Sequence, residues 1–268
     1  MALLRLLSIM EMLNRNRAEA EGLYLASSRK GRLKLSFDSS RTTTCPDSSY
    51  IALWNYEPTN FKDIIITAFG GNTRGVADPP ELKQFCDIST IFKDMKHTNL
   101  YDFACTMEQP YGYYNYWHTT TFINDERIMA KAVEAHAAAV DKIKKSLPSY
   151  YGRLGDERGG NVMGLDQHLK GRNAISMLLS INVSEEHIRE YGLQVAQEYL
   201  KEVDDFAKSV EGYIDWTYVN YADKAQDPLG SLLGSLLEPS RIKSTALKYD
   251  PDGVFQKRTP GGFKISDC

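Results

Sequence analysis

Short segments in which β-branched and aromatic residues alternate with polar ones recur along the chain and predict strands. They lie at residues 32–37, 50–56, 63–69, 116–123, 174–183 and 212–221. Two longer segments predict helices: residues 124–147, which end before Pro148, and residues 184–210, which open with a serine followed by acidic residues. A shorter helix is expected at about residues 239–247.

The first 22 residues predict an amphipathic helix, because leucine and methionine recur at helical spacing. The apolar positions are Leu3, Leu6, Leu7, Met10 and Leu13. Charged residues interrupt this run, and it is shorter than the roughly 20 apolar residues that a bilayer span needs. We therefore expect neither a signal peptide nor contact with a membrane.

After the N-terminal helix, the order of the elements is four strands, a helix, a strand, a helix, a strand and a C-terminal helix. Strands interspersed with long helices predict an α+β fold, with a single, largely antiparallel sheet and helices packed on one face. No internal repeat, low-complexity segment or linker divides the chain, so we expect one domain over residues 1–268.

Charge and cysteine content narrow the function classes. The 268 residues carry 35 acidic and 32 basic side chains, so the chain has no excess of positive charge for nucleic acid. None of the four cysteines forms a Cys-x-x-Cys pair, so we expect no metal site and a reducing, cytoplasmic location. The motifs of dinucleotide, phosphate-loop, nucleophile-elbow and zinc-protease sites are absent from the sequence, so nucleophile triads and metal sites have no sequence support.

Aromatic residues are the one compositional skew. Sixteen tyrosines, ten phenylalanines and three tryptophans make up 11% of the chain. Tyrosine combines an apolar ring with a hydrogen-bonding tip, which suits a pocket for an apolar organic ligand. A tyrosine-rich β core is the alternative interpretation.

Rows of aromatic and polar side chains within the predicted strands are the candidate site. Residues two apart in a strand share a face, and buried polar groups there need a partner. The candidate substrate-binding residues are Trp54, Tyr116, Thr120, Trp216, Tyr218 and Asn220. His118 shares the face of Tyr116 and Thr120, and Arg74 lies in a glycine-flanked turn. Plain packing for the aromatic residues, and a solvated loop charge for Arg74, are the alternatives.

Three C-terminal motifs resemble those of the fungal FAD-linked oxidoreductases of the berberine-bridge-enzyme type. Residues 216–223 read Trp-Thr-Tyr-Val-Asn-Tyr-Ala-Asp, residues 249–256 read Tyr-Asp-Pro-Asp-Gly-Val-Phe-Gln, and residues 260–264 read Pro-Gly-Gly-Phe-Lys. Residues 160–165 and 85–101 are also similar to that family, and the resemblance covers roughly residues 50–265. It implies the family's substrate-binding domain.

The resemblance also implies what differs from the family. The Gly-Gly-His segment that attaches the flavin is absent ahead of the matching region, so we expect a stand-alone domain with no flavin domain and no cofactor. Tyr221 matches the position of the general base in carbohydrate-oxidising members. Residues 231–234 read Ser-Leu-Leu-Gly where many relatives have Ser-Tyr-Gly, which exchanges a polar contact for an apolar one. The N-terminal helix, or a second copy in a homodimer, is expected to cover the exposed sheet face.

The chain is also similar to the flavin-free members that act as hetero-Diels–Alderases on a hydroxymethyl tropolone and a humulene-type terpene. The resemblance implies that the tropolone loses water to give an ortho-quinone methide, which then adds to the alkene. His118 or Tyr221 would donate the proton, and Arg74 would pair with an anion. The alternatives are another redox-neutral dehydratase, cyclase or isomerase, or a substrate-binding subunit that partners a separate flavin domain.

Overall fold

The structure of the chain is a computed structural model. The described residues are 4–12, 21–27, 48–56, 64–72, 74–76, 80, 92–99, 101–102, 105, 111–146, 154–155, 168–169, 172, 174–233 and 239–265.

One antiparallel sheet contains all nine strands of the described residues. Their order across the sheet is β5-β2-β4-β3-β1-β8-β6-β9, and β7 pairs with β8 outside this order. Every pair is antiparallel. The strands are β1 (Leu4–Met12), β2 (Glu21–Ser27), β3 (Ser48–Tyr56), β4 (Ile65–Asn72), β5 (Phe92–Lys96), β6 (Tyr114–Ile123), β7 (Leu154–Gly155), β8 (Ala174–Val183) and β9 (Tyr213–Ile214).

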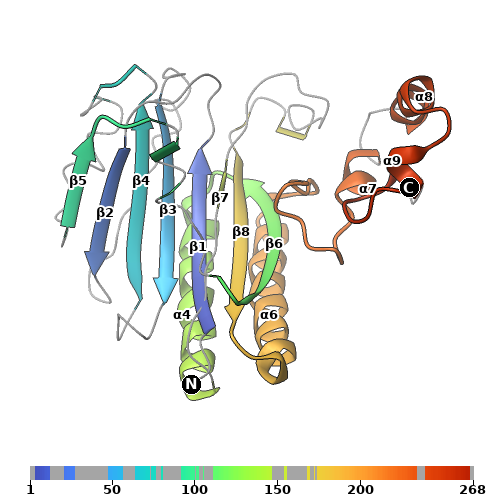
Figure 1. Ribbon diagram of the computed structural model, residues 1–268. Helices are drawn as coiled ribbons and strands as arrows, with labels where there is room; N and C mark the ends of the chain where they lie inside the picture. The colour runs from blue at the N-terminus through green and yellow to red at the C-terminus, as the bar shows by residue number, and fades with distance from the viewer. Residues whose placement is uncertain are drawn as a thin grey trace.

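Two long helices, α4 (Glu126–Ser146) and α6 (Arg189–Ser209), cover one face of the sheet (Figure 1). A short 3-10 turn, η2 (Glu186–Ile188), leads into α6. The helices α7 (Pro228–Leu233), α8 (Pro239–Tyr249) and α9 (Val254–Lys257) lie beyond β6, away from the face that α4 and α6 cover. The α+β fold with helices on one face is thus confirmed, and α7 and α9 are additions to the prediction.

The register of β6 against β8 determines which side chains lie under the helices. Thr120 pairs with Met177, and both contact α6: the Thr120 hydroxyl donates to Asp204 Oδ1 at 2.5 Å, and the Tyr199 hydroxyl lies 3.4 Å from Met177 Sδ. We call this side the helix face and the opposite side the second face. In the two strands, the second face carries Trp117, Thr119, Thr121, Ser176, Leu178, Ser180 and Asn182.

The predicted N-terminal helix is wrong over the described residues, because Leu4–Met12 forms strand β1 at the centre of the sheet. It pairs with β3 on one side and β8 on the other. A short apolar run fits a buried strand as well as a helix, and periodicity alone does not separate the two. This segment therefore does not cover a sheet face as a helix, as the sequence predicted. The homodimer stays a prediction.

The other strand predictions divide into three groups. β3, β4, β6 and β8 lie at the strands predicted for residues 50–56, 63–69, 116–123 and 174–183, and β2, β5 and β7 are additional. The segment at residues 32–37 lies outside the described residues. The predicted strand at 212–221 shrinks to Tyr213–Ile214, after which the chain turns. No helix in the described ranges is both long enough and apolar enough to cross a membrane.

Candidate functional site

Four aromatic rings beside β6 contact one another in series. Trp117 meets Tyr221 edge-on, with ring centroids 5.8 Å apart, and Tyr221 meets Tyr218 edge-on at 4.7 Å. Tyr218 stacks on Trp216 at 5.7 Å, with 16° between the ring planes. Trp216 is 2% exposed, whereas the other three rings are half-buried. We call these four residues the aromatic cluster.

Gln226 attaches the segment that carries three of these rings to the edge of β6. Its Oε1 accepts hydrogen bonds from the N–H groups of Thr119 (3.0 Å) and Asp223 (3.1 Å), and its Nε2 donates to the Thr119 carbonyl at 2.7 Å. The side chain therefore binds the Thr119 backbone as a neighbouring strand would. This contact explains why the chain after Ile214 follows β6 without continuing the sheet.

The second face next to Trp117 carries buried oxygen atoms without a hydrogen-bond partner in the described part of the chain. They are Ser180 Oγ, Asn182 Oδ1, Thr121 Oγ1 and, from β3, Asn55 Oδ1. Thr119 Oγ1 on the same face is satisfied, because it donates to the Met177 carbonyl at 3.0 Å. A buried polar group left without a partner costs about 1–3 kcal/mol, so such a group points to a ligand or an ordered water.

Three predicted substrate-binding residues lie on the helix face, away from the aromatic cluster. Trp54 and Tyr116 are buried in the core between the sheet and the helices, and the Arg189 guanidinium lies 5.2 Å from the Tyr116 ring centre. Thr120 donates to Asp204, a carboxylate whose pKa is raised by burial. These contacts account for all three side chains as packing and tertiary structure, so we leave them out of the candidate site.

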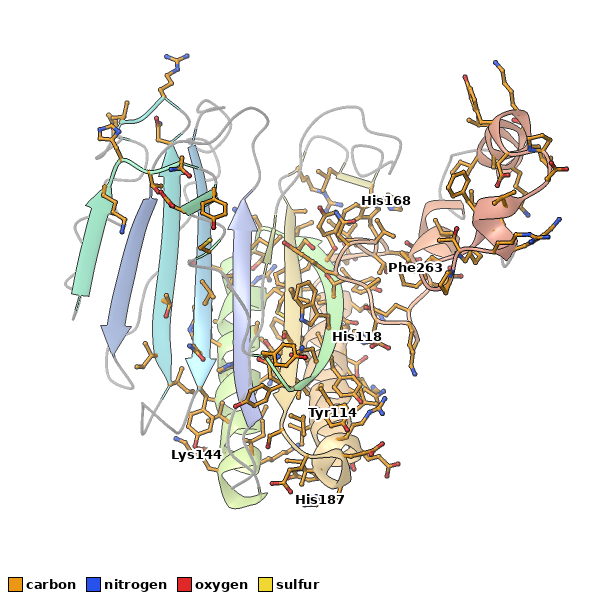
Figure 2. The ribbon with its side chains drawn as sticks, in the orientation of Figure 1. Tyr114, His118, Lys144, His168, His187 and Phe263 are labelled. Atoms are coloured by element: carbon orange, nitrogen blue, oxygen red, sulfur yellow. The ribbon has the colours of Figure 1, made fainter. Side chains whose placement is uncertain are left out.

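His118 also faces the helix side but lies close to the edge of the sheet. Burial lowers the pKa of His118 below its ordinary value of 6.5, and the nearby Asp223 carboxylate opposes that shift. The imidazole is therefore neutral at pH 7 and suits accepting a proton better than donating one. Figure 2 shows His118 partway along β6, between Tyr114 and the end of the strand near His168.

Arg74 is separated from the aromatic cluster by much of the sheet. It is exposed in the turn that follows β4, and β3, β1 and β8 lie between β4 and β6. Asn220 is exposed too, and its Nδ2 donates to the Tyr218 hydroxyl at 2.8 Å. The structure thus brings Trp216, Tyr218, Tyr221 and Asn220 together and leaves Arg74 apart.

Trp117, Gln226 and His168 are parts of this region that the sequence analysis did not single out. Neither predicted row contains Trp117, although the alternation of β6 places its side chain on the sheet face opposite to that of His118. His168 adjoins Leu169, which packs in one apolar cluster with Trp216. Its Nε2 is buried without a hydrogen-bond partner among the described residues, and burial lowers its pKa. A lone histidine in an unpatterned segment carries no sequence signal.

No group of three or more His, Cys, Asp or Glu side chains in the described ranges could hold a metal ion. The aromatic cluster and the unpartnered oxygens offer apolar walls, phenol hydroxyls and further oxygen atoms for hydrogen bonds. Such a combination is typical of a site for a small organic molecule.

Comparison with known proteins relates the chain to fungal flavoenzymes. It is 32% identical over 164 residues to the FAD-dependent monooxygenase drtC of Aspergillus calidoustus, covering 55% of this chain and 30% of that protein. It is 27% identical over 235 residues to the FAD-dependent monooxygenase sdcF of Emericella nidulans, covering 82% and 48%. The chain thus spans between about a third and a half of these relatives. No family model matches it.

The fold is that of the berberine-bridge-enzyme-like proteins. A variant of Physcomitrella patens BBE-like 1 superposes with a TM-score of 0.56 over 89% of this chain and 53% of the other, at 14% identity. The wild-type protein gives a TM-score of 0.53. The expected resemblance is supported in fold and in sequence similarity, so the chain is similar to berberine-bridge-enzyme-like proteins and to fungal enzymes named as FAD-dependent monooxygenases.

Proposed function

We propose that this chain forms the substrate-binding part of an enzyme that acts on a small aromatic or apolar organic molecule. The observation that carries the proposal is the aromatic cluster, in which four rings contact in series along the edge of β6. Aromatic walls remove an apolar ligand from water, and the tyrosine hydroxyls at their rims orient it.

Tyr221 is the residue that we propose moves a proton. Its ring lies between Trp117 and Tyr218, and both contacts are edge-on, so two neighbours restrict its orientation. A phenol can donate a proton to a leaving hydroxyl or accept one from a substrate hydroxyl, provided that it lies within hydrogen-bond reach. Tyr218 accepts a hydrogen bond from Asn220, which directs the Tyr218 hydroxyl proton elsewhere.

FAD is the cofactor that the relatives' names print, and the starts of the two long helices do not fit its diphosphate. A diphosphate binds at helix N-termini with free N–H groups and positive potential. Here α4 begins beside Asp125 and Glu126, and α6 follows Glu185 and Glu186, so both starts carry carboxylates that repel phosphate. A bound flavin would therefore have its diphosphate away from the starts of α4 and α6.

The similarity to FAD-dependent monooxygenases favours one reaction, an oxidation of the bound molecule in which this chain supplies the substrate side. In this candidate the aromatic cluster binds and orients the molecule, and Tyr221 donates or accepts the proton. The redox chemistry belongs to the flavin.

The second candidate is the hetero-Diels–Alder reaction that the sequence motifs suggest. A hydroxymethyl tropolone loses water to give an ortho-quinone methide, and an alkene of the humulene type adds to it. One C–C and one C–O bond form and a dihydropyran ring closes, so the sequence needs no oxidant. The aromatic cluster favours this candidate, because cycloaddition depends on orientation and on exclusion of water.

Binding and turnover separate these candidates. The purified chain is titrated with a tropolone by tryptophan fluorescence, then incubated with hydroxymethyl tropolone and humulene, with and without FAD. Tyr221→Phe should reduce turnover, whereas Tyr116→Phe, on the helix face, should not. Adduct formed without FAD faster than in buffer supports the cycloaddition, and an oxidised product only with FAD supports the oxidation. If the chain does not bind the tropolone and forms no product, the proposal is refuted.

A further inference from the structure

Two buried oxygens on β8 lack a hydrogen-bond partner in the part of the chain that the structure describes. Ser180 Oγ and Asn182 Oδ1 belong to residues that are 3% and 0% exposed. Both side chains point to the second face, because they are two residues apart on one strand. With a rise of about 3.4 Å per residue, their Cα atoms are about 7 Å apart.

The hydrogen bonds around Asn182 determine which of its atoms is left over. Its Nδ2 donates to Asn115 Oδ1, and Asn115 Nδ2 in turn donates to the Tyr113 carbonyl at 3.4 Å. This chain of donors orients both amides, so the remaining group of Asn182 is a carbonyl oxygen. A carbonyl oxygen accepts only, and its missing partner must therefore present an O–H or N–H group.

An aromatic surface lies directly beside these oxygens. Ser180 is opposite Trp117 in the register of β8 and β6, and side chains that face each other across an antiparallel pair are in contact range. Trp117 is half-buried and leads to Tyr221 through their edge contact. A planar ligand ring that lies against Trp117 would therefore have one of its edges above β8.

We infer that Ser180 Oγ and Asn182 Oδ1 bind two donor groups on the edge of a planar aromatic ligand whose ring lies against Trp117. The inference rests on the proposed function and narrows its substrate class. The ligand is a fused or extended aromatic molecule with two hydroxyl or N–H groups about 7 Å apart. Replacement of these donors by methyl ethers leaves Asn182 Oδ1 without a partner, whereas the Ser180 hydroxyl can still donate to an ether oxygen.

Three probes test this inference: a dihydroxynaphthalene with its hydroxyls at opposite ends of the ring pair, its dimethyl ether, and unsubstituted naphthalene. Dissociation constants are measured by tryptophan fluorescence for the wild type and for Ser180→Ala and Asn182→Leu. The dihydroxy compound should bind the wild type at least about tenfold more tightly than the ether. Asn182→Leu should reduce that ratio by about tenfold and leave the affinity for the ether unchanged. Ser180→Ala should weaken the binding of both oxygenated probes and leave the affinity for naphthalene unchanged, because the Ser180 hydroxyl can pair with a hydroxyl or an ether oxygen.

Thr121→Val is the matched control, since Thr121 Oγ1 is also buried without a partner but lies four residues from Trp117 along β6. It should keep the wild-type ratio. Each variant is measured with several probes. Partial unfolding weakens the apparent binding of all probes by the same factor, so the ratio of their dissociation constants does not change. Equal affinity of the wild type for the dihydroxy compound and the ether overturns the inference alone and assigns the oxygens to ordered water. Failure of all three probes to bind the wild type overturns the proposed function as well.

Discussion

Substitution of Gln226 by leucine should destabilise the protein and release the aromatic cluster from β6. Gln226 makes three hydrogen bonds, two of them with the backbone of Thr119, a residue that is 2% exposed. Leucine is similar in size but neither donates nor accepts. The Thr119 N–H and carbonyl groups would lose their partners at the edge of the sheet.

The magnitude follows from these two backbone groups. A buried donor or acceptor left without a partner costs about 1–3 kcal/mol. At the edge of the sheet, water can reach one of these two backbone groups. We therefore expect a loss of about 2–4 kcal/mol in the free energy of unfolding. For a chain of this size, this loss corresponds to roughly 5–15 °C in Tm.

Urea denaturation followed by circular dichroism measures the loss, and the near-ultraviolet spectrum reports the packing of Trp117 and Tyr221. Gln194→Leu is the control, because Gln194 makes a single hydrogen bond to Glu198 on the exposed side of α6. It should change the free energy of unfolding by less than about 0.5 kcal/mol. If both variants lose the same stability, or if the near-ultraviolet spectrum of Gln226→Leu equals that of the wild type, Gln226 does not hold the segment on β6.

Four further results are expected. Thr120→Val should cost about 1.5–3 kcal/mol of stability, because it removes a hydrogen bond to a carboxylate, and should leave ligand affinity unchanged; weaker binding would return Thr120 to the site. Burial raises the pKa of Asp204, so its contribution to stability is present below the unfolded pKa and is lost as pH rises through the folded pKa. Asp204→Asn should therefore flatten that fall in denaturation curves between acid and neutral pH, and an unchanged profile contradicts the assignment. Gly212→Ala would place a Cβ 2.4 Å from Ile128 Cδ1 and should cost about 1–3 kcal/mol, part of which the added change Ile128→Val recovers; purely additive losses would show that the two side chains do not clash. The His118 imidazole should titrate below 6.5 in an NMR pH series, and a value above 6.5 would show that its carboxylate neighbour outweighs burial.

Strand β8 was predictable to its last residue, whereas β1 and β9 were not. In residues 174–183 the polar residues stand at 176, 180 and 182, between apolar ones, and this alternation favours a strand. The N-terminal run fits helix and strand equally, and its pairing with β3 and β8, distant in sequence, decides for the strand. In residues 212–221 the aromatic alternation predicted a strand, but Gln226 occupies the β6 edge at Thr119.

The candidate site was half predictable for a similar reason. Alternation along β6 correctly separates Tyr116, His118 and Thr120 from Trp117 and Thr119, since it depends only on the pleat. Which of these rows lies under α6 depends on tertiary packing, and no local pattern contains it. The row chosen from sequence is the one that the helices cover. The motif at residues 216–221, by contrast, contributed four residues that the structure does bring together.

The central position of β1 has a consequence for how the chain folds. Leu4 pairs with Val183, so the sheet cannot close around β1 until a strand nearly two hundred residues later has been synthesised. Contacts between such distant residues slow folding, because the chain loses loop entropy before the pairing compensates for it. At a synthesis rate of about 5–20 residues per second, one edge of β1 therefore lacks its β8 partner for roughly 10–35 seconds. Over that interval the nascent chain depends on β3, or on a chaperone, to keep this apolar strand from pairing with other chains.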